Sequence, residues 1–211
     1  MQLLDIHTHH LPLRPEQAIL NYSSEMLSVE FLTYCSVGIH PWHLTTDNFQ
    51  EKWDWLVLAT HYPNVLAIGE AGLDKAIDVP FDLQMDAFKR QIELSEVMEL
   101  PLIIHCVRAA NEIVELKKKV QPHMPWIIHG FRGKKEQALQ YIRHGIFLSF
   151  GEKYQEEALR AVPVDRLFLE TDESAIEINL LYEQAATTRS LSVESLTMQI
   201  QQNINEVFFN R

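Results

Sequence analysis

Hydrophobic residues recur along the chain in two alternating patterns. Short runs rich in β-branched and aromatic residues are followed by longer segments in which hydrophobic positions are three or four residues apart. The short runs predict strands over residues 2–6, 18–22, 34–38, 65–69, 102–106, 126–130, 146–150 and 167–170. Short strands alternating with longer helical segments are typical of parallel strands joined by crossover helices.

The helical pattern is clearest in the second half of the chain. Met85, Phe88 and Ile92 recur at helical spacing, and a similar series from Leu196 to Phe208 predicts a C-terminal helix. The runs at 101–104 and 167–169 are continuously apolar, as expected for strands buried on both faces of a parallel sheet.

Eight strands with intervening helices predict one α/β domain, residues 1–211, with the fold of a compact (β/α)8 TIM-type barrel. The first and third strands are separated by too few residues to hold a strand and two full helices. We therefore expect the first one or two helices to be missing or reduced to single turns. An open doubly wound sheet is the alternative, and the strand count fits it less well.

Composition narrows the class of protein. With 46% hydrophobic residues the chain can bury a core, which excludes disorder, and no apolar run approaches the roughly 18 residues that a membrane span needs. Two cysteines, Cys35 and Cys106, and the lack of a signal-peptide pattern predict a cytoplasmic protein. Nothing in the sequence indicates an obligate protein partner. The net charge of −11 counts against broad binding of nucleic acid through phosphates.

Residues of metal-ligand type follow five of the predicted strands. In a parallel barrel the carboxyl ends of the strands share one face, so these side chains should converge. A single histidine after a strand is more often a hydrogen-bonded capping residue. A converging set would be costly to desolvate unless a metal satisfied it. We therefore predict a metal site formed by His7, His9, Glu70, His105, His129 and Asp172.

The segments around these residues resemble the TatD family of metal-dependent hydrolases, within the amidohydrolase-like barrels. The matching segments are Asp5-Ile-His-Thr-His9, Gly38-Ile-His-Pro-Trp42, Ile68-Gly-Glu-Ala-Gly-Leu-Asp74, Ile104-His-Cys106, Ile128-His-Gly-Phe131 and Leu169-Glu-Thr-Asp172. The resemblance implies a barrel that binds one or two divalent ions and hydrolyses phosphodiesters, typically as a deoxyribonuclease. The family usually has a proline soon after Glu-Thr-Asp, whereas Glu173-Ser-Ala-Ile-Glu follows here. This loop helps line the mouth of the barrel, so the resemblance defines the metal ligands better than the substrate.

The resemblance also implies roles for the candidate ligands. His7, His9, Glu70 and Asp172 would hold one ion, and Glu70 would bridge to a second ion held by the two remaining histidines. Imidazoles and carboxylates suit Zn, Mn, Co or Ni better than Ca, and Mg stays among the candidates. We expect Asp172 to orient the attacking water and accept its proton, with Glu70 as the second catalytic residue.

Three further residues are expected to bind substrate: His40, Arg108 and Arg132. The two arginines belong to loops that follow strands, as do several lysines, so a basic collar should surround the mouth of an otherwise acidic barrel. This placement favours capture of a phosphate-containing substrate such as the end of a single DNA strand.

The sequence is compatible with three functions. The first is a TatD-like phosphodiesterase or deoxyribonuclease. The second is the same metal barrel acting on a small phosphate ester, an amide or a lactone. The third is a metal-binding protein without catalysis, which the complete ligand set disfavours.

Overall fold

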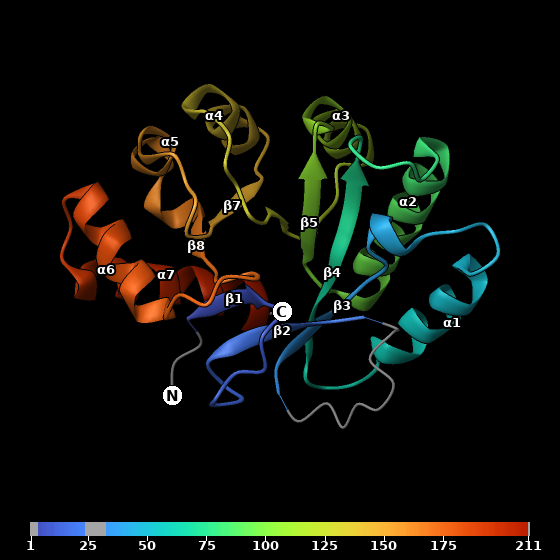
Figure 1. Cartoon of the computed structure of the whole chain (residues 1–211), viewed down its shortest axis with the longest axis horizontal. Coiled ribbons are helices and arrows are strands. Elements are labelled where there is room, and N and C mark those ends of the chain that lie inside the picture. The colour runs from blue at the N-terminus through green and yellow to red at the C-terminus, as the bar shows by residue number, and fades with distance from the viewer. Residues whose placement is uncertain (1–3, 24–32, 211) are drawn as a thin grey trace.

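The computed structural model, which describes residues 4–23 and 33–210, is a barrel of eight parallel strands (Figure 1). The strands neighbour one another in chain order: β1 (Asp5–Thr8), β2 (Ala18–Tyr22), β3 (Cys35–Val37), β4 (Val65–Asp74), β5 (Leu102–Val107), β6 (Trp126–Ile128), β7 (Phe147–Phe150) and β8 (Leu167–Leu169). The predicted fold class is therefore confirmed, and the open doubly wound sheet is excluded by the strand order.

The barrel closes where β1 meets the segment after β8. Thr8 and Asp172 form a parallel bridge. The backbone N–H of Asp172 donates to the His7 carbonyl at 2.9 Å, and the His9 N–H donates to the Asp172 carbonyl at 3.0 Å. Closure therefore brings three predicted site residues to the same seam.

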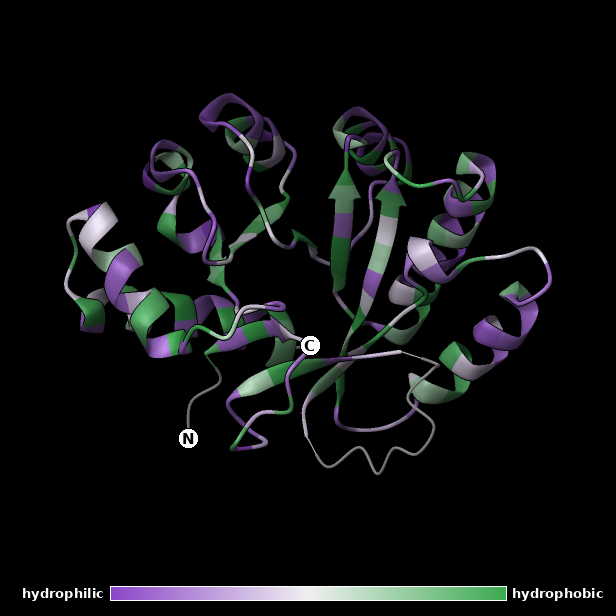
Figure 2. Ribbon diagram, viewed as in Figure 1, coloured by the Kyte–Doolittle hydropathy of each residue, from purple (hydrophilic) through white to green (hydrophobic). Residues whose placement is uncertain are grey.

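Helices surround the strands and cover their outer side (Figure 1). They are η1 (Pro41–His43), α1 (Phe49–Ala59), α2 (Phe81–Met98), α3 (Ala110–Val120), α4 (Lys135–Arg143), α5 (Glu156–Ala161), η2 (Val164–Arg166), α6 (Ile178–Arg189), α7 (Val193–Ile204) and the π-helical turn η3 (Asn205–Phe209). Figure 2 shows hydrophobic residues concentrated in the strands and hydrophilic ones spread over the helices. No helix among the described residues is long and apolar enough to cross a membrane.

The prediction that the first helices are missing or reduced is confirmed for the connection between β1 and β2. Residues 9–17, between β1 and β2, contain turns and bends but no helix. The second connection includes residues 24–32, which lie outside the described part of the chain, so the prediction for a second helix is not tested there. The first α-helix of the described residues, α1, follows β3.

Three predicted strand ends differ from the structure by two residues or more. β1 ends at Thr8 rather than Ile6, β4 ends at Asp74 rather than Gly69, and β6 ends at Ile128 rather than Gly130. Gly72, which follows Gly69 by three residues, allows close strand pairing. Gly72 pairs with His105, and a Cβ at Gly72 would lie 2.0 Å from the His105 carbonyl oxygen. Pairing therefore continues to the end of β4, and Glu70 lies inside the strand.

Candidate metal centre

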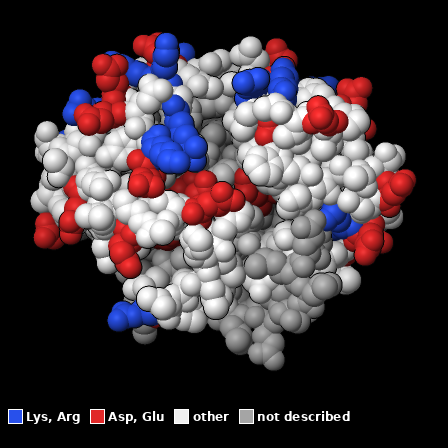
Figure 3. Space-filling view, in the orientation of Figure 1, with Lys and Arg blue, Asp and Glu red and all other residues white. Residues whose placement is uncertain are grey.

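All six predicted ligands meet at the carboxyl ends of the strands. His7, Glu70 and His105 lie within β1, β4 and β5, and the others follow β1, β6 and β8. Their side chains form overlapping groups whose ligand atoms lie within 4.8 Å of one another. All of them except the fully buried His7 border a cleft of about 870 Å³. Figure 3 shows a hollow near the centre of the view, with Asp and Glu side chains below it and Lys and Arg side chains on its left.

Glu70 lies at the centre of the cluster and faces two sets of histidines. Its Oε2 lies 3.6 Å from His7 Nε2 and 3.5 Å from His9 Nε2. Its Oε1 lies 2.7 Å from both His105 Nδ1 and His129 Nε2. One carboxylate is thus placed between two ligand groups, as the bridging prediction requires.

Asp172 joins the first of these groups. Its Oδ1 lies 3.8 Å from His7 Nε2 and 3.6 Å from His9 Nε2. His7 is fully buried, yet neither of its ring nitrogens has a hydrogen-bond partner among the described residues. An unpaired buried imidazole is costly, and coordination of an ion would satisfy it. The donor set of His7, His9, Glu70 and Asp172 therefore fits a divalent metal.

The charges within the cluster are strongly coupled. Burial alone would raise the pKa of the Glu70 carboxyl, but the charge of His129 and hydrogen bonds from His105 and His129 outweigh burial and hold that pKa well below its usual range. Burial would lower the pKa of His129, but the carboxylates of Glu70 and Glu170 raise it well above 6.5. Without a metal, the centre is therefore an ionised carboxylate beside a protonated imidazole.

His40 belongs to this cluster rather than to its rim. Its Nε2 lies 3.1 Å from Glu70 Oε1, and its Nδ1 accepts a hydrogen bond from the Trp42 backbone N–H at 3.1 Å. Burial lowers the pKa of the His40 imidazole, despite the hydrogen bond to Glu70. His40 also borders the cleft, so the predicted contact with substrate stays a proposal.

The two predicted arginines both border the cleft. Arg132 Nη2 lies 3.8 Å from Asp172 Oδ2, and the Arg132 side chain is 59% exposed. Lys75, which follows β4 and is one of the lysines expected in the basic collar, forms an ion pair with Glu112, and neither residue borders the cleft. The positive side chains that border the cleft are therefore mainly those of Arg108 and Arg132.

Sequence reasoning missed two buried carboxylates that hold the histidines. Glu170 Oε1 lies 3.3 Å from His129 Nδ1, and Asp74 Oδ2 lies 3.1 Å from His105 Nε2. A signal for Asp74 was present, because residues four apart in an extended strand point to the same side, and Asp74 comes four residues after Glu70. Glu170 likewise precedes Asp172 by two residues.

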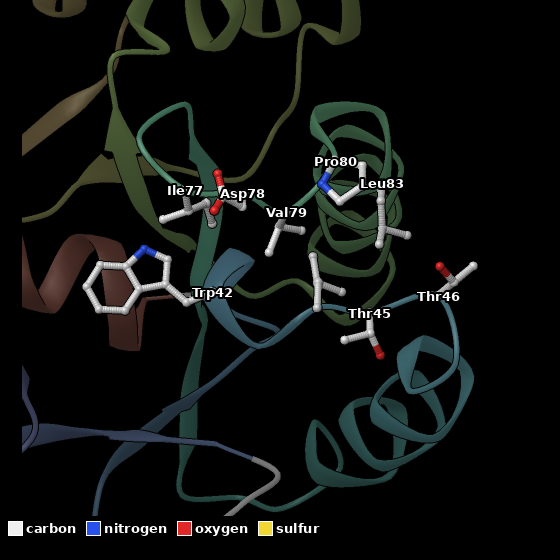
Figure 4. A pocket seen from close by; sticks show the side chains of 9 residues that line it. Trp42, Thr45, Thr46, Ile77, Asp78, Val79, Pro80 and Leu83 are labelled. Atoms are coloured by element: carbon white, nitrogen blue, oxygen red, sulfur yellow. The ribbon is translucent and has the colours of Figure 1, made fainter.

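A smaller crevice lies beside the cleft and shares Trp42 with it. Its volume is about 490 Å³, and it lies between the segment after η1 and the start of α2. Figure 4 shows Trp42 at one end of this crevice, with its indole directed away from Leu83 and Thr46. Trp42 therefore forms the boundary between the crevice and the cleft.

Comparison with known proteins places these features in a family. The family model described as TatD related DNase matches residues 13–209. The metal-dependent hydrolase YabD of Bacillus subtilis, itself uncharacterised, is 32% identical over 166 residues, which are 74% of this chain and 65% of YabD. The "3'-5' ssDNA/RNA exonuclease TatD" of a Rahnella species is 30% identical over 71% of this chain and 61% of its own. The chain thus spans less than two thirds of these relatives.

Solved structures support the fold. The crystal structure of YJJV, a TatD homologue from Escherichia coli K12, superposes with a TM-score of 0.82 and covers 98% of this chain and 97% of that one, at 18% identity. A TatD family hydrolase from Entamoeba histolytica gives a TM-score of 0.79 at 15% identity and covers 100% of this chain and 99% of its own. At such low identity, these likenesses establish the barrel alone.

Proposed function

Because the chain belongs to the TatD-related DNase family, we propose that it is a metal-dependent phosphodiesterase that shortens single-stranded DNA from one end. The proposed cofactor is one or two divalent ions, held by His7, His9, Glu70 and Asp172 on one side and by Glu70, His105 and His129 on the other. The relative from Rahnella is named for a 3'-5' exonuclease activity on ssDNA and RNA, which supports the same class of substrate here.

One observation carries the proposal: the Glu70 carboxylate turns one oxygen toward His7 and His9 and the other toward His105 and His129. A purely structural carboxylate does not need two separate sets of imidazoles, and it does not explain why the ring nitrogens of His7 are buried without a hydrogen-bond partner. A carboxylate shared between two ion positions would need both sets.

The cofactor defines the chemistry, and the chain's own residues direct it. A bound divalent ion supplies a Lewis acid for phosphate oxygens and makes water acidic enough to act as a nucleophile near neutral pH. Asp172 turns Oδ1 toward the histidines and Oδ2 toward Arg132. In this position its carboxylate orients the attacking water and accepts its proton, while Arg132 and Arg108 bind the substrate phosphates.

The charge distribution supports binding of an end rather than of a long duplex. The chain has a net charge of −11, which opposes extended contact with a phosphate backbone. Arg108 and Arg132 instead place positive charge at the cleft itself. Few phosphates are then engaged, and those few lie next to the ligand cluster.

A reconstitution experiment tests the proposal. The metal-stripped protein is loaded with Zn, Mn, Mg, Co or Ni in turn. Each form is then offered single-stranded DNA labelled at the 5' or the 3' end, the corresponding duplex and RNA, small phosphate esters, and a panel of amides and lactones. We expect progressive shortening of single-stranded DNA from one end with at least one metal. Cleavage of small esters, amides or lactones with intact DNA would contradict the proposed substrate, and metal binding without any turnover would contradict catalysis.

The Asp172→Asn variant tests the role of the base. We expect turnover to fall by about 10²–10⁴-fold while much of the metal stays bound. Asp165→Asn is the matched control, because Asp165 lies in η2, before β8, whereas Asp172 follows the carboxyl end of β8. Unchanged turnover in Asp172→Asn would exclude this carboxylate as the base.

A further inference from the structure

Trp42 and Asp74 are joined by a hydrogen bond that links η1 to the end of β4. The Trp42 indole Nε1–H donates to Asp74 Oδ2 at 2.7 Å. Asp74 is 2% exposed and is itself held in place, because its Oδ1 accepts the Ala76 N–H at 2.8 Å and its backbone N–H donates to Gln84 at 2.8 Å. The Asp74 carboxylate therefore has a defined orientation.

This carboxylate determines which nitrogen of His105 carries a proton. Asp74 Oδ2 lies 3.1 Å from His105 Nε2. An ionised carboxylate only accepts hydrogen bonds, so His105 Nε2 must be the donor. When an ion binds, Nε2 keeps its proton because it donates to Asp74, so Nδ1, which faces Glu70 Oε1 at 2.7 Å, is the nitrogen that would give up its hydrogen bond and coordinate the ion.

The backbone of Trp42 imposes the opposite arrangement on His40. The Trp42 N–H donates to His40 Nδ1, so in the neutral ring Nδ1 is the acceptor and Nε2 carries the proton. That Nε2 faces Glu70 Oε1 at 3.1 Å and can only donate to it. His40, Glu70 and His105 lie close enough together to form a ligand group, but only His105 can offer the nitrogen that faces the centre to an ion and still keep its other hydrogen bond.

We infer that Trp42 and Asp74 are positioning residues that assign His105 as a metal ligand and His40 as a hydrogen-bond donor to Glu70. The inference rests on the proposed function in treating Glu70 and His105 as part of a metal site. It goes further, because it explains why two similar histidines beside one carboxylate have different roles. Carboxylates that accept from the second nitrogen of a ligating histidine typically change metal affinity by 10–100-fold when removed.

Two variants test the inference through different bonds. The Asp74→Asn side chain has one accepting oxygen instead of two, and its amide nitrogen cannot accept a hydrogen bond. It therefore cannot keep all three bonds, to Trp42, His105 and the Ala76 N–H. Trp42→Phe removes the indole donor alone and keeps the backbone N–H that holds His40. Asp78→Asn is the matched control, since Asp78 is an exposed carboxylate in the loop that follows β4, four residues after Asp74.

The measurements are zinc affinity, by competition with a chromophoric chelator, and the ring ¹⁵N chemical shifts of the zinc-loaded protein. In the wild type and in Asp78→Asn we expect His105 to be protonated at Nε2 and coordinated through Nδ1, and His40 to be protonated at Nε2 without coordination. In Asp74→Asn we expect zinc affinity to fall about 10–100-fold and the protonation of His105 to change. In Trp42→Phe we expect a smaller loss of affinity, with His40 unchanged.

The outcomes separate this inference from the proposed function. Failure of the wild type to bind zinc or any other divalent ion would overturn the proposed function. Zinc binding with the same affinity and the same His105 ring state in Asp74→Asn as in the wild type would overturn the positioning role alone. Coordination through His40 in the wild type would also overturn it.

Discussion

Glu170 lies beneath His129, with its Oε1 at 3.3 Å from the histidine Nδ1. Glu170 is fully buried, and burial would raise the pKa of its carboxyl, but the contact with His129 lowers that pKa below its usual range. Its negative charge therefore holds the His129 ring with Nε2 directed at Glu70, 2.7 Å away. Asp74 supports His105 in a similar way but with the ring nitrogens exchanged, since Asp74 faces Nε2 and Nδ1 faces Glu70.

Replacing this charge should weaken metal binding without removing a ligand. In Glu170→Gln the side chain keeps its size but loses the charge that orients His129. We expect the affinity for zinc to fall by about tenfold or more, measured by chelator competition. Glu136→Gln, on the exposed first turn of α4, is the control and should bind zinc as the wild type does. Equal affinities in both variants would contradict the role of Glu170.

Arg132 offers a test of phosphate binding. It is exposed and lies beside Asp172, at the edge of the cleft. In Arg132→Gln we expect KM for a single-stranded oligonucleotide to rise about threefold to tenfold, and the dependence of log affinity on log salt to lose about one unit of slope. Arg143→Gln, at the end of α4, should change neither quantity. A slope that is the same in Arg132→Gln and the wild type would exclude a phosphate contact at this residue.

Close packing at Gly72 predicts a large loss of stability on substitution. A Cβ there would meet the His105 carbonyl oxygen at 2.0 Å, and the φ of +148° is also unfavourable for other residues. We expect Gly72→Ala to lower the free energy of unfolding by about 3 kcal/mol or more, measured by urea denaturation. Gly145→Ala is the control, because Gly145 has a φ of +69° but no atom within 4 Å of the added Cβ. It should lose only about 1–2 kcal/mol.

Lys117 predicts a dependence of stability on pH. Its ammonium lies 5.0 Å from the Trp126 ring centre, and burial lowers its pKa from 10.5 to about 8. Between pH 8 and pH 10.5 the folded protein therefore binds fewer protons at this site than the unfolded chain, so the contribution of Lys117 to stability improves as pH rises.

The matched pair for this test is Lys117→Met and Lys118→Met. We expect Lys117→Met to be more stable than the wild type at pH 7, and the difference to shrink toward pH 10, measured by urea denaturation at each pH. Lys118 is exposed on the next position of α3, so its variant should follow the wild type throughout. A constant difference for Lys117→Met would show that its proton is not linked to folding.

Several strands and their polar ends could be predicted because a candidate ligand directly follows a continuous apolar run. His105 after Leu102-Ile-Ile and His129 after Trp126-Ile-Ile are examples, since such runs occur in strands covered on both faces. The length of β4 could not be predicted in this way. Its glycines have the composition of a turn, and only the neighbouring strand β5 shows that they are sites of close approach.

The supporting residues were harder to predict for a different reason. Trp42 and Asp74 are 32 positions apart, and their hydrogen bond depends on the fold of η1 over the end of β4. Nothing in the local pattern around Trp42 indicates that its side chain and its backbone act on two different histidines. Pairings of this kind are set by tertiary packing, which hydrophobic periodicity does not describe.

The position of Glu70 between two sets of histidines has a thermodynamic consequence. One rigidly held carboxylate cannot adjust to an ion on its Oε2 side without changing its charge and orientation on its Oε1 side. In the proposed site with two ions, the affinities of the two sides would therefore be linked, and the linkage would be reciprocal. A titration of this protein with metal should accordingly be analysed with a coupling free energy rather than as two independent sites.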